Sequence, residues 1–100
     1  MQNKFLLFSK KSCGPCMLVD KYLKSIKDQR TDLIEYVDLE DVGSEPNEEE
    51  KAIAKKYSVT ATPVLLVIKG DDEDCVLEEF IGGLSITQNI RRTFDKYCYD

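Results

Sequence analysis

Two uninterrupted apolar runs constrain the fold more than any other feature of this sequence. They span residues 5–8 and 64–68, and neither contains a polar or charged residue. A strand that is apolar at every position must be covered on both faces, whereas a strand with one solvated face alternates apolar and polar residues. We therefore expect both runs to lie in the centre of a sheet that helices cover.

The other elements follow from apolar spacing and from turn residues. Amphipathic helices are expected over residues 14–29, from Pro46 to Tyr57, and from Ser85 to the end of the chain, where Ser85 and Gln88 have the spacing of a capping box. Strands are expected at residues 33–37 and 75–81, with a loop over 38–45 and a turn over 69–74.

The resulting order is β-α-β-α-β-β-α, because the apolar runs at 5–8 and 64–68 supply the first and third strands. The first two strands, joined through a helix, are expected to be parallel, and the last two, joined by a short turn, antiparallel. This predicts an α/β fold with a four-stranded mixed sheet flanked by helices. At 100 residues, the chain is expected to form one domain, residues 1–100.

Composition and charge exclude several classes of partner. The net charge is −5, from 14 Lys and Arg against 19 Asp and Glu, which argues against nucleic acid and anionic membrane surfaces and favours basic partners. Neither apolar run approaches the roughly 20 residues of a membrane-spanning helix. The amino terminus also lacks the apolar stretch of a secretory signal. We therefore expect a cytoplasmic monomer.

Cys13 and Cys16 carry the chemistry that this sequence indicates. Cys13 stands where the first strand gives way to a helix, and the free N–H groups and partial positive charge of a helix start stabilise a thiolate. Lys10 and Lys11 precede it, so we expect the Cys13 pKa to lie below the usual value of about 8.5. Cys16 returns to the same helical face one turn later, close enough to form a disulfide.

This spacing predicts thiol–disulfide exchange, in which Cys13 attacks a partner's disulfide and Cys16 resolves the mixed disulfide. Pro15 suits the first helical turn, and Gly14 lets another chain approach the sulfurs. No cofactor beyond the Cys13–Cys16 couple is required. The main alternative, a zinc or shared iron–sulfur site, needs more ligands than a chain with no His and no second C-x-x-C supplies, so no metal is expected. Cys75 and Cys98 are expected to be ordinary thiols, with a disulfide between them left open.

The Cys13-Gly14-Pro15-Cys16 motif between a buried strand and an amphipathic helix resembles the active site of thioredoxins. Two further stretches, residues 55–64 and 80–85, are similar to the thioredoxin segments that lead to its cis-proline and to its last helix. The resemblance covers nearly the whole chain and implies a minimal thioredoxin fold. It also implies that Thr62–Pro63 is a cis peptide beside the sulfurs, although an X–Pro bond taken alone is usually trans.

The resemblance further implies a substrate-binding surface around the cysteines. The Thr62 backbone would pair with a substrate chain, and Gly82 and Gly83 would form the glycine turn before the last helix. The implied substrates are disulfide-containing proteins, and ribonucleotide reductase is one candidate among them. The implied electron source is a thioredoxin reductase or glutathione.

Three departures from the thioredoxin pattern matter. Ser12 stands where thioredoxins usually carry a tryptophan, and the chain contains no Trp. Leu7 occupies the position, six residues before Cys13, of the buried aspartate that moves protons for the second cysteine. Proton removal from Cys16 would then fall to water, to the mixed-disulfide sulfur or to a charged neighbour such as Lys11. The first strand begins near the amino terminus, as in glutaredoxins.

Three functions therefore compete. The first is a thioredoxin-like protein disulfide reductase and electron carrier that serves cell redox homeostasis. The second is a glutaredoxin-like oxidoreductase coupled to glutathione, for which Lys11 is one candidate clamp for a glutathione carboxylate. The third is a non-catalytic thioredoxin-fold module that binds a partner or a metal. The first is our prediction.

Overall fold

Four strands form one sheet in the order β2-β1-β3-β4. The computed structural model of the chain describes residues 2–39 and 47–98. β1 pairs in parallel with β2 and antiparallel with β3, and β3 pairs antiparallel with β4. The two apolar runs therefore occupy the two central strands, as predicted. The strands are β1 (Lys4–Ser9), β2 (Ile34–Asp38), β3 (Val64–Lys69) and β4 (Asp72–Ile81).

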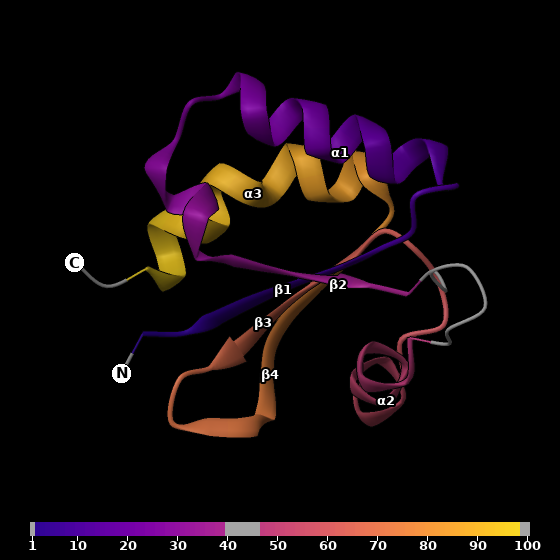
Figure 1. Cartoon of the computed structure of the whole chain (residues 1–100). Helices are drawn as coiled ribbons and strands as arrows, with labels where there is room; N and C mark the ends of the chain where they lie inside the picture. The colour runs from indigo at the N-terminus through magenta and orange to yellow at the C-terminus, as the bar shows by residue number, and fades with distance from the viewer. Residues whose placement is uncertain (1, 40–46, 99–100) are drawn as a thin grey trace.

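Helices cover both faces of this sheet (Figure 1). On one face α1 (Gly14–Ser25) and α3 (Gly83–Tyr97) pack side by side, and on the other lies α2 (Glu48–Lys56). None of the helices among the described residues is long and apolar enough to cross a membrane. The α/β class, the mixed sheet and the predicted order of elements are confirmed.

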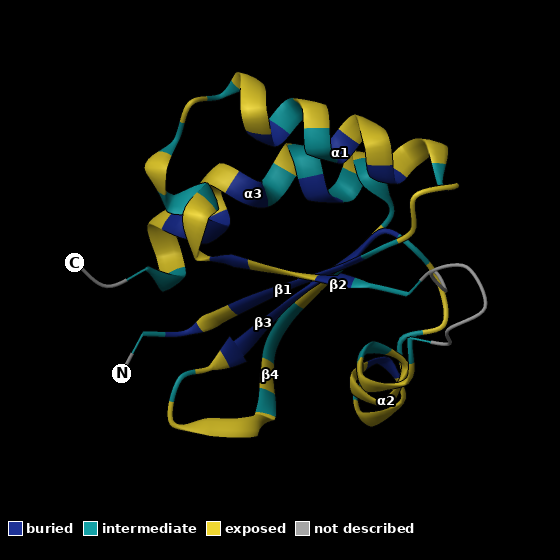
Figure 2. Ribbon diagram, in the orientation of Figure 1, coloured by how far each residue is buried: buried dark blue, intermediate teal, exposed yellow. Residues whose placement is uncertain are grey.

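The core is divided in two because β1 and β3 send alternate side chains to opposite faces. Figure 2 shows the buried residues concentrated in these central strands and in the helix surfaces that face them. The residues buried under α1 and α3 include Phe5, Leu7, Val19, Leu65, Ile86 and Phe94. Those on the α2 side include Leu6, Phe8, Ala54, Val64, Leu66 and Ile68. The side chains of each apolar run therefore contribute to two separate cores, one on each face of the sheet.

The first helix ends earlier than the sequence predicts. We expected it to reach residue 29, but α1 ends at Ser25 and a 3-10 helix, η1 (Gln29–Leu33), follows. The helix ends because Lys27 adopts a φ of 51°, a left-handed conformation through which an α-helix cannot continue. Asp28 then caps η1 by accepting a hydrogen bond from the Arg30 backbone N–H at 2.9 Å.

The predicted capping box at the start of the last helix is wrong. α3 begins at Gly83, so Ser85 lies inside its first turn, and the N-cap residue is Gly82. The Gly82 carbonyl accepts the hydrogen bond from the Ile86 N–H at 3.1 Å. A φ of +95° at this cap favours glycine, so backbone conformation sets the start of the helix.

Two other boundaries shift without changing the topology. The second strand runs from Ile34 to Asp38, one residue later than expected, and β4 begins at Asp72 instead of Cys75. The longer β4 is accommodated by irregular pairing with β3 around Ile68. The loop at 40–45 and the predicted helix start at Pro46 lie outside the described residues.

Candidate active site

Cys13 is the N-cap residue of α1. Its backbone is extended, with φ −94° and ψ 113°, and its Sγ accepts a hydrogen bond from the Cys16 backbone N–H at 3.2 Å. The sulfur therefore sits at the positive end of the helix with a backbone donor directed at it. Both features favour negative charge on Cys13 Sγ.

Cys13 and Cys16 are joined in a disulfide, with their Cα atoms 5.2 Å apart. The two cysteines differ in exposure, because Cys13 is half-buried whereas Cys16 is only 6% exposed. A partner can therefore reach Cys13 more easily than Cys16. This asymmetry suits a pair in which one sulfur meets the substrate and the other reacts within the molecule.

Gly83 lets the start of α3 approach the C-x-x-C turn closely. A Cβ at this position would lie 3.2 Å from the Pro15 carbonyl oxygen and 3.6 Å from a Val19 methyl carbon. Gly14, in contrast, is exposed and its missing Cβ would meet nothing within 4 Å. The space beside Gly14 is open to an approaching chain, whereas a side chain at position 83 would press on the Pro15 backbone.

Pro63 brings a third segment beside the C-x-x-C turn and the start of α3. The Thr62–Pro63 peptide bond is cis, as the resemblance implied, and Pro63 is fully buried. Its carbonyl oxygen accepts a hydrogen bond from the Gly82 N–H at 2.9 Å. The segments that contain Cys13, Pro63 and Gly83 therefore meet through the Pro63–Gly82 bond and the Gly83–Pro15 contact.

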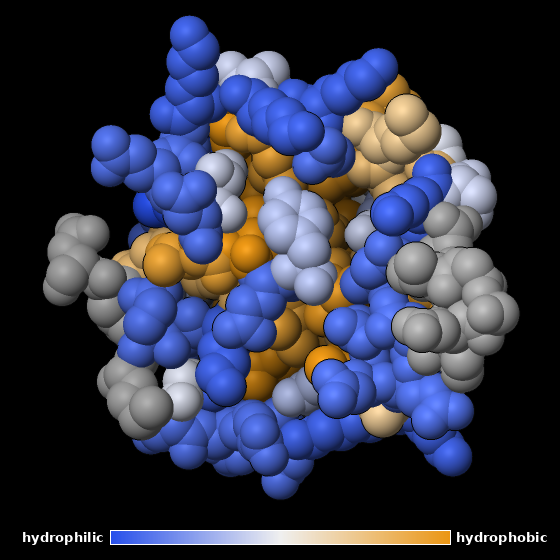
Figure 3. All heavy atoms as spheres, in the orientation of Figure 1, coloured by the Kyte–Doolittle hydropathy of each residue, from blue (hydrophilic) through white to orange (hydrophobic). Residues whose placement is uncertain are grey.

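Exposed apolar side chains flank these segments. Leu18 and Leu84 are 66% and 72% exposed, and Ile81 is 60% exposed. Figure 3 shows hydrophobic atoms at the surface near the start of α1, whereas hydrophilic atoms cover the hairpin end. Clustered exposed apolar residues are typical of a surface that contacts a partner.

A cavity of about 320 Å³ adjoins Cys16 on the side of β1 and β2. Leu7, Lys11, Asp20, Tyr36 and Asp38 are among its lining residues. Leu7 is 2% exposed and supplies no titratable group. Burial, followed by the nearby Asp20 carboxylate, raises the pKa of Tyr36. The groups that could exchange a proton beside Cys16 are therefore the carboxylates of Asp20 and Asp38, the ammonium groups of Lys11 and of Lys10, which also lines this cavity, and water.

The sequence analysis named Lys11 here but missed Asp20 and Asp38. The signal for Asp20 was its spacing, because it follows Cys16 by four residues and so lies on the same face of α1. Asp38 comes beside Lys11 only through the parallel pairing of β1 and β2, in which Ser9 lies opposite Asp38. That register could not be read from the sequence.

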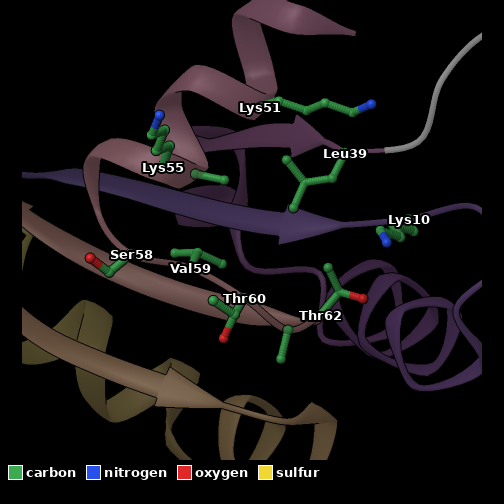
Figure 4. A pocket seen from close by; sticks show the side chains of 10 residues that line it. Lys10, Leu39, Lys51, Lys55, Ser58, Val59, Thr60 and Thr62 are labelled. Atoms are coloured by element: carbon green, nitrogen blue, oxygen red, sulfur yellow. The ribbon is translucent and has the colours of Figure 1, made fainter. Parts of the chain in front are cut away.

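A second and larger groove, of about 740 Å³, lies between α2 and the segment that leads to Pro63. Figure 4 shows Lys51 and Lys55 extending from α2 and Lys10 from the end of β1, with Thr60 and Thr62 on the connecting segment. We call it the lysine groove; its polar lining residues are Lys10, Lys51, Lys55, Ser58, Thr60 and Thr62. The sequence analysis did not identify it.

The structure also bears on the two remaining cysteines and on the predicted alternative of a metal site. Cys75 and Cys98 are half-buried and are not joined to each other, so they do not form the disulfide that the sequence left open. Among residues 2–39 and 47–98, His, Cys, Asp and Glu side chains form no group of three that could hold a metal ion. The described part of the chain thus gives no support to a metal site.

Solved thioredoxins have the same fold. Thioredoxin NaTrxh from Nicotiana alata matches with a TM-score of 0.68 at 17% sequence identity, over 98% of this chain and 75% of that one. A Schistosoma mansoni thioredoxin pre-protein gives 0.69 at 18% identity, over 96% and 79% of the two chains. Thioredoxin from Fasciola hepatica gives 0.65 at 21% identity, over 96% and 81%. No protein-family model and no curated protein sequence matches.

The chain therefore has the thioredoxin fold. At the start of α1 it carries a disulfide between the two cysteines of a C-x-x-C motif, one half-buried and one buried. This combination supports a thiol–disulfide oxidoreductase.

Proposed function

We propose that this protein reduces disulfides in protein substrates through the reversible Cys13–Cys16 couple, in the manner of a thioredoxin. The observation that carries the proposal is the unequal exposure of the two disulfide-bonded cysteines at a helix start. Cys13 has the helix end and a backbone N–H to stabilise its thiolate, and Cys16 is held out of solvent directly behind it.

The reaction starts from the reduced dithiol and proceeds in two exchanges. The Cys13 thiolate attacks one sulfur of the substrate disulfide, so a mixed disulfide forms and the other substrate sulfur leaves as a thiolate. The Cys16 thiolate then attacks Cys13 Sγ, which forms the Cys13–Cys16 disulfide and releases the second substrate thiolate. Two electrons pass from the protein to the substrate, and the two thiol protons end on the substrate thiols.

The buried thiol of Cys16 must lose its proton before the second exchange. In thioredoxin-like proteins a buried aspartate would assist at the position of Leu7, and this chain lacks that group. The Asp20 and Asp38 carboxylates and Lys11 line the cavity beside Cys16. We propose that the proton leaves through this cavity to one of these groups or to water.

The oxidised protein must be reduced again by an external donor. We propose a thioredoxin reductase in this role, acting in the cytoplasm, where thiols are kept reduced. Ribonucleotide reductase is a candidate among the protein substrates, because small redoxins of similar size reduce it. Gly14, Thr62 and the Gly82–Gly83 turn would form the surface that a substrate chain contacts.

Trapping the mixed disulfide tests this function directly. Reduced Cys16→Ser protein should form a stable mixed disulfide with a disulfide-linked peptide, because Cys13 can attack but nothing resolves the product. Cys13→Ser protein, the matched control, should form none. Intact mass spectrometry measures both. Equal labelling of the two variants, or of neither, would contradict the proposed roles and would favour the non-catalytic interaction module.

A further inference from the structure

The lysine groove has a charge opposite to that of the whole chain. The protein carries a net charge of −5, yet the residues described as lining the groove include three lysines and no Asp or Glu. The other described lining residues are three with hydroxyl groups and four apolar ones. The groove is therefore a local positive site on a negative molecule, with hydrogen-bond donors beside the cations.

Two of these cations form no ion pair with any residue that the structure describes. No carboxylate among the described residues lies within ion-pair distance of Lys10 or Lys55, whereas the neighbouring Lys56 pairs with Glu73 at 3.0 Å. Lys10 and Lys55 are both exposed. No described carboxylate competes for their charges, which can therefore act on a ligand.

The groove lies beside the reacting sulfur. Lys10 lines it, and the Lys10 carbonyl accepts a hydrogen bond from the Cys13 N–H at 3.2 Å. Thr62, at the other side of the opening in Figure 4, directly precedes the buried Pro63. A chain bonded to Cys13 through a disulfide would thus have its neighbouring residues within reach of the groove.

We propose that the lysine groove binds an acidic segment of the protein substrate, next to the half-cystine that Cys13 attacks. This inference rests on the proposed function and specifies its substrate class. Lys10 and Lys55 would attract Asp or Glu side chains, and the Ser58, Thr60 and Thr62 hydroxyls would donate hydrogen bonds to their carboxylates. The net charge of −5 alone favours basic partners. Near the disulfide, the proposal instead favours an acidic segment of the partner.

Glutathione fits the groove less well than an acidic segment does. Glutathione carries an ammonium group besides its two carboxylates, and the described lining offers no Asp or Glu to that ammonium. A segment inside a polypeptide has no such group. Charge complementarity therefore favours the peptide.

Two matched peptides test the proposal. They differ only in the three residues on each side of one half-cystine, which are Glu in one and Gln in the other. Reduced protein is mixed with each, and the second-order rate constant for its oxidation by the peptide is measured at low ionic strength and at about 0.5 M salt, where the Debye length falls below about 5 Å. We expect the Glu peptide to react about tenfold faster at low salt and the ratio to shrink at high salt.

A pair of variants with equal net charge locates the effect. In Lys10→Gln/Lys55→Gln protein the Glu-to-Gln ratio should fall to about one. In the control Lys21→Gln/Lys69→Gln, which removes two exposed lysines outside the groove, it should persist. A ratio near one in the unmodified protein, or an equal loss in both variants, would overturn the proposal.

Oxidised glutathione provides the third probe. If it reacted as fast as the Glu peptide, and if Lys10→Gln/Lys55→Gln slowed it, the groove would be a glutathione site and the peptide proposal would be wrong. A different result would contradict the proposed function itself: the reduced protein would reduce neither peptide. Reduction of both peptides at one rate would leave the function standing and remove only the groove's role.

Discussion

Charged side chains at the two ends of the sheet are used differently. At the end that carries the hairpin and η1, Arg30 pairs with both Asp28 and Asp95, each at 2.7 Å, and Lys56 pairs with Glu73 at 3.0 Å. At the end that carries the disulfide, Lys10, Lys11 and Lys55 pair with no carboxylate among the described residues.

Helix α2 contains this contrast within a single turn. Lys56 is directed to the hairpin acids, while the adjacent Lys55 lines the lysine groove and pairs with no carboxylate among the described residues. Pairs at the surface add little stability, but they fix the orientation of neighbouring elements. Cations without an internal partner remain available for binding. The comparison teaches that the cations facing the hairpin are held in ion pairs, whereas Lys10 and Lys55 in the lysine groove are not paired with any described carboxylate. The ion pair of Asp20 with Lys24 at 3.0 Å lies on the other side of Cys16.

The largest expected effect comes from removing the exposed sulfur at the reacting end. Cys13→Ser should abolish the reduction of a peptide disulfide, because Cys13 is the N-cap of α1 and the other sulfur of the pair, Cys16, is buried and only 6% exposed. Cys75→Ser, which changes a half-buried thiol in β4, should retain the wild-type rate. Turnover measured with excess dithiothreitol checks both. If Cys75→Ser lost as much activity as Cys13→Ser, the reaction would not depend specifically on the end of the sheet that carries the disulfide.

Packing against the C-x-x-C turn gives the next effect. Gly83→Val should lower the free energy of unfolding by about 1–3 kcal/mol, since its Cβ alone would lie 3.2 Å from the Pro15 carbonyl oxygen. Gly14→Ala meets nothing within 4 Å and should be neutral or slightly stabilising. Urea unfolding measures both. If the two substitutions had the same effect, the contact between α3 and the active-site turn would be unimportant.

Substitutions of Asp28 test the role of the ion pairs at the end of the sheet that carries η1 and the hairpin. Asp28→Ala removes the cap of η1 and should cost about 1 kcal/mol, whereas Asp28→Asn keeps a capping oxygen and should cost less. Turnover should be unchanged in both, because Asp28 follows the far end of α1. A loss of activity in Asp28→Asn would show that the two ends are coupled.

The same carboxylate has a defined pH dependence. The hydrogen-bonded Arg30 side chain holds the pKa of Asp28 below its usual value of 3.8. Since the folded pKa is the lower one, this stabilisation is present above about pH 4 and is lost as the pH falls through the folded value. The stability difference between the wild type and Asp28→Asn should therefore be constant near neutrality and shrink in acid, which urea unfolding at several pH values would show.

The smallest effect is expected for the exposed pair between α2 and the hairpin. Lys56 lowers the pKa of Glu73 through their hydrogen bond, yet both side chains are well exposed. Glu73→Gln should leave turnover unchanged and alter stability by no more than the error of chemical unfolding. A clear change in peptide reduction would contradict the division between structural and binding charges.

Much of the fold was predictable because its central strands leave few alternatives. The runs at residues 5–8 and 64–68 contain no polar residue, so only central positions in a covered sheet suit them. The errors arose at helix ends. Lys27 ends α1 through a left-handed backbone, and Gly82 caps α3 in place of Ser85. Such backbone conformations are decided by the surrounding structure more than by the local pattern.

The candidate site was predictable where its residues are close in sequence. Cys13 and Cys16 lie one helical turn apart, so their pairing follows from spacing. The lysine groove was not predictable, since Lys10 at the end of β1 and Lys55 on α2 come to line one groove only in the folded chain. The Asp38 carboxylate likewise reaches the cavity beside Cys16 only through strand register.

The reduction potential of the Cys13–Cys16 couple tests the central claim most directly. The protein, with Cys75→Ser and Cys98→Ser to isolate the couple, would be equilibrated in dithiothreitol buffers and its free thiols trapped. We predict one reversible two-electron transition near about −270 mV, as for a reductant fed by a reductase. A value of about −200 to −230 mV would point to glutathione coupling. No reversible transition at all would contradict the proposed function.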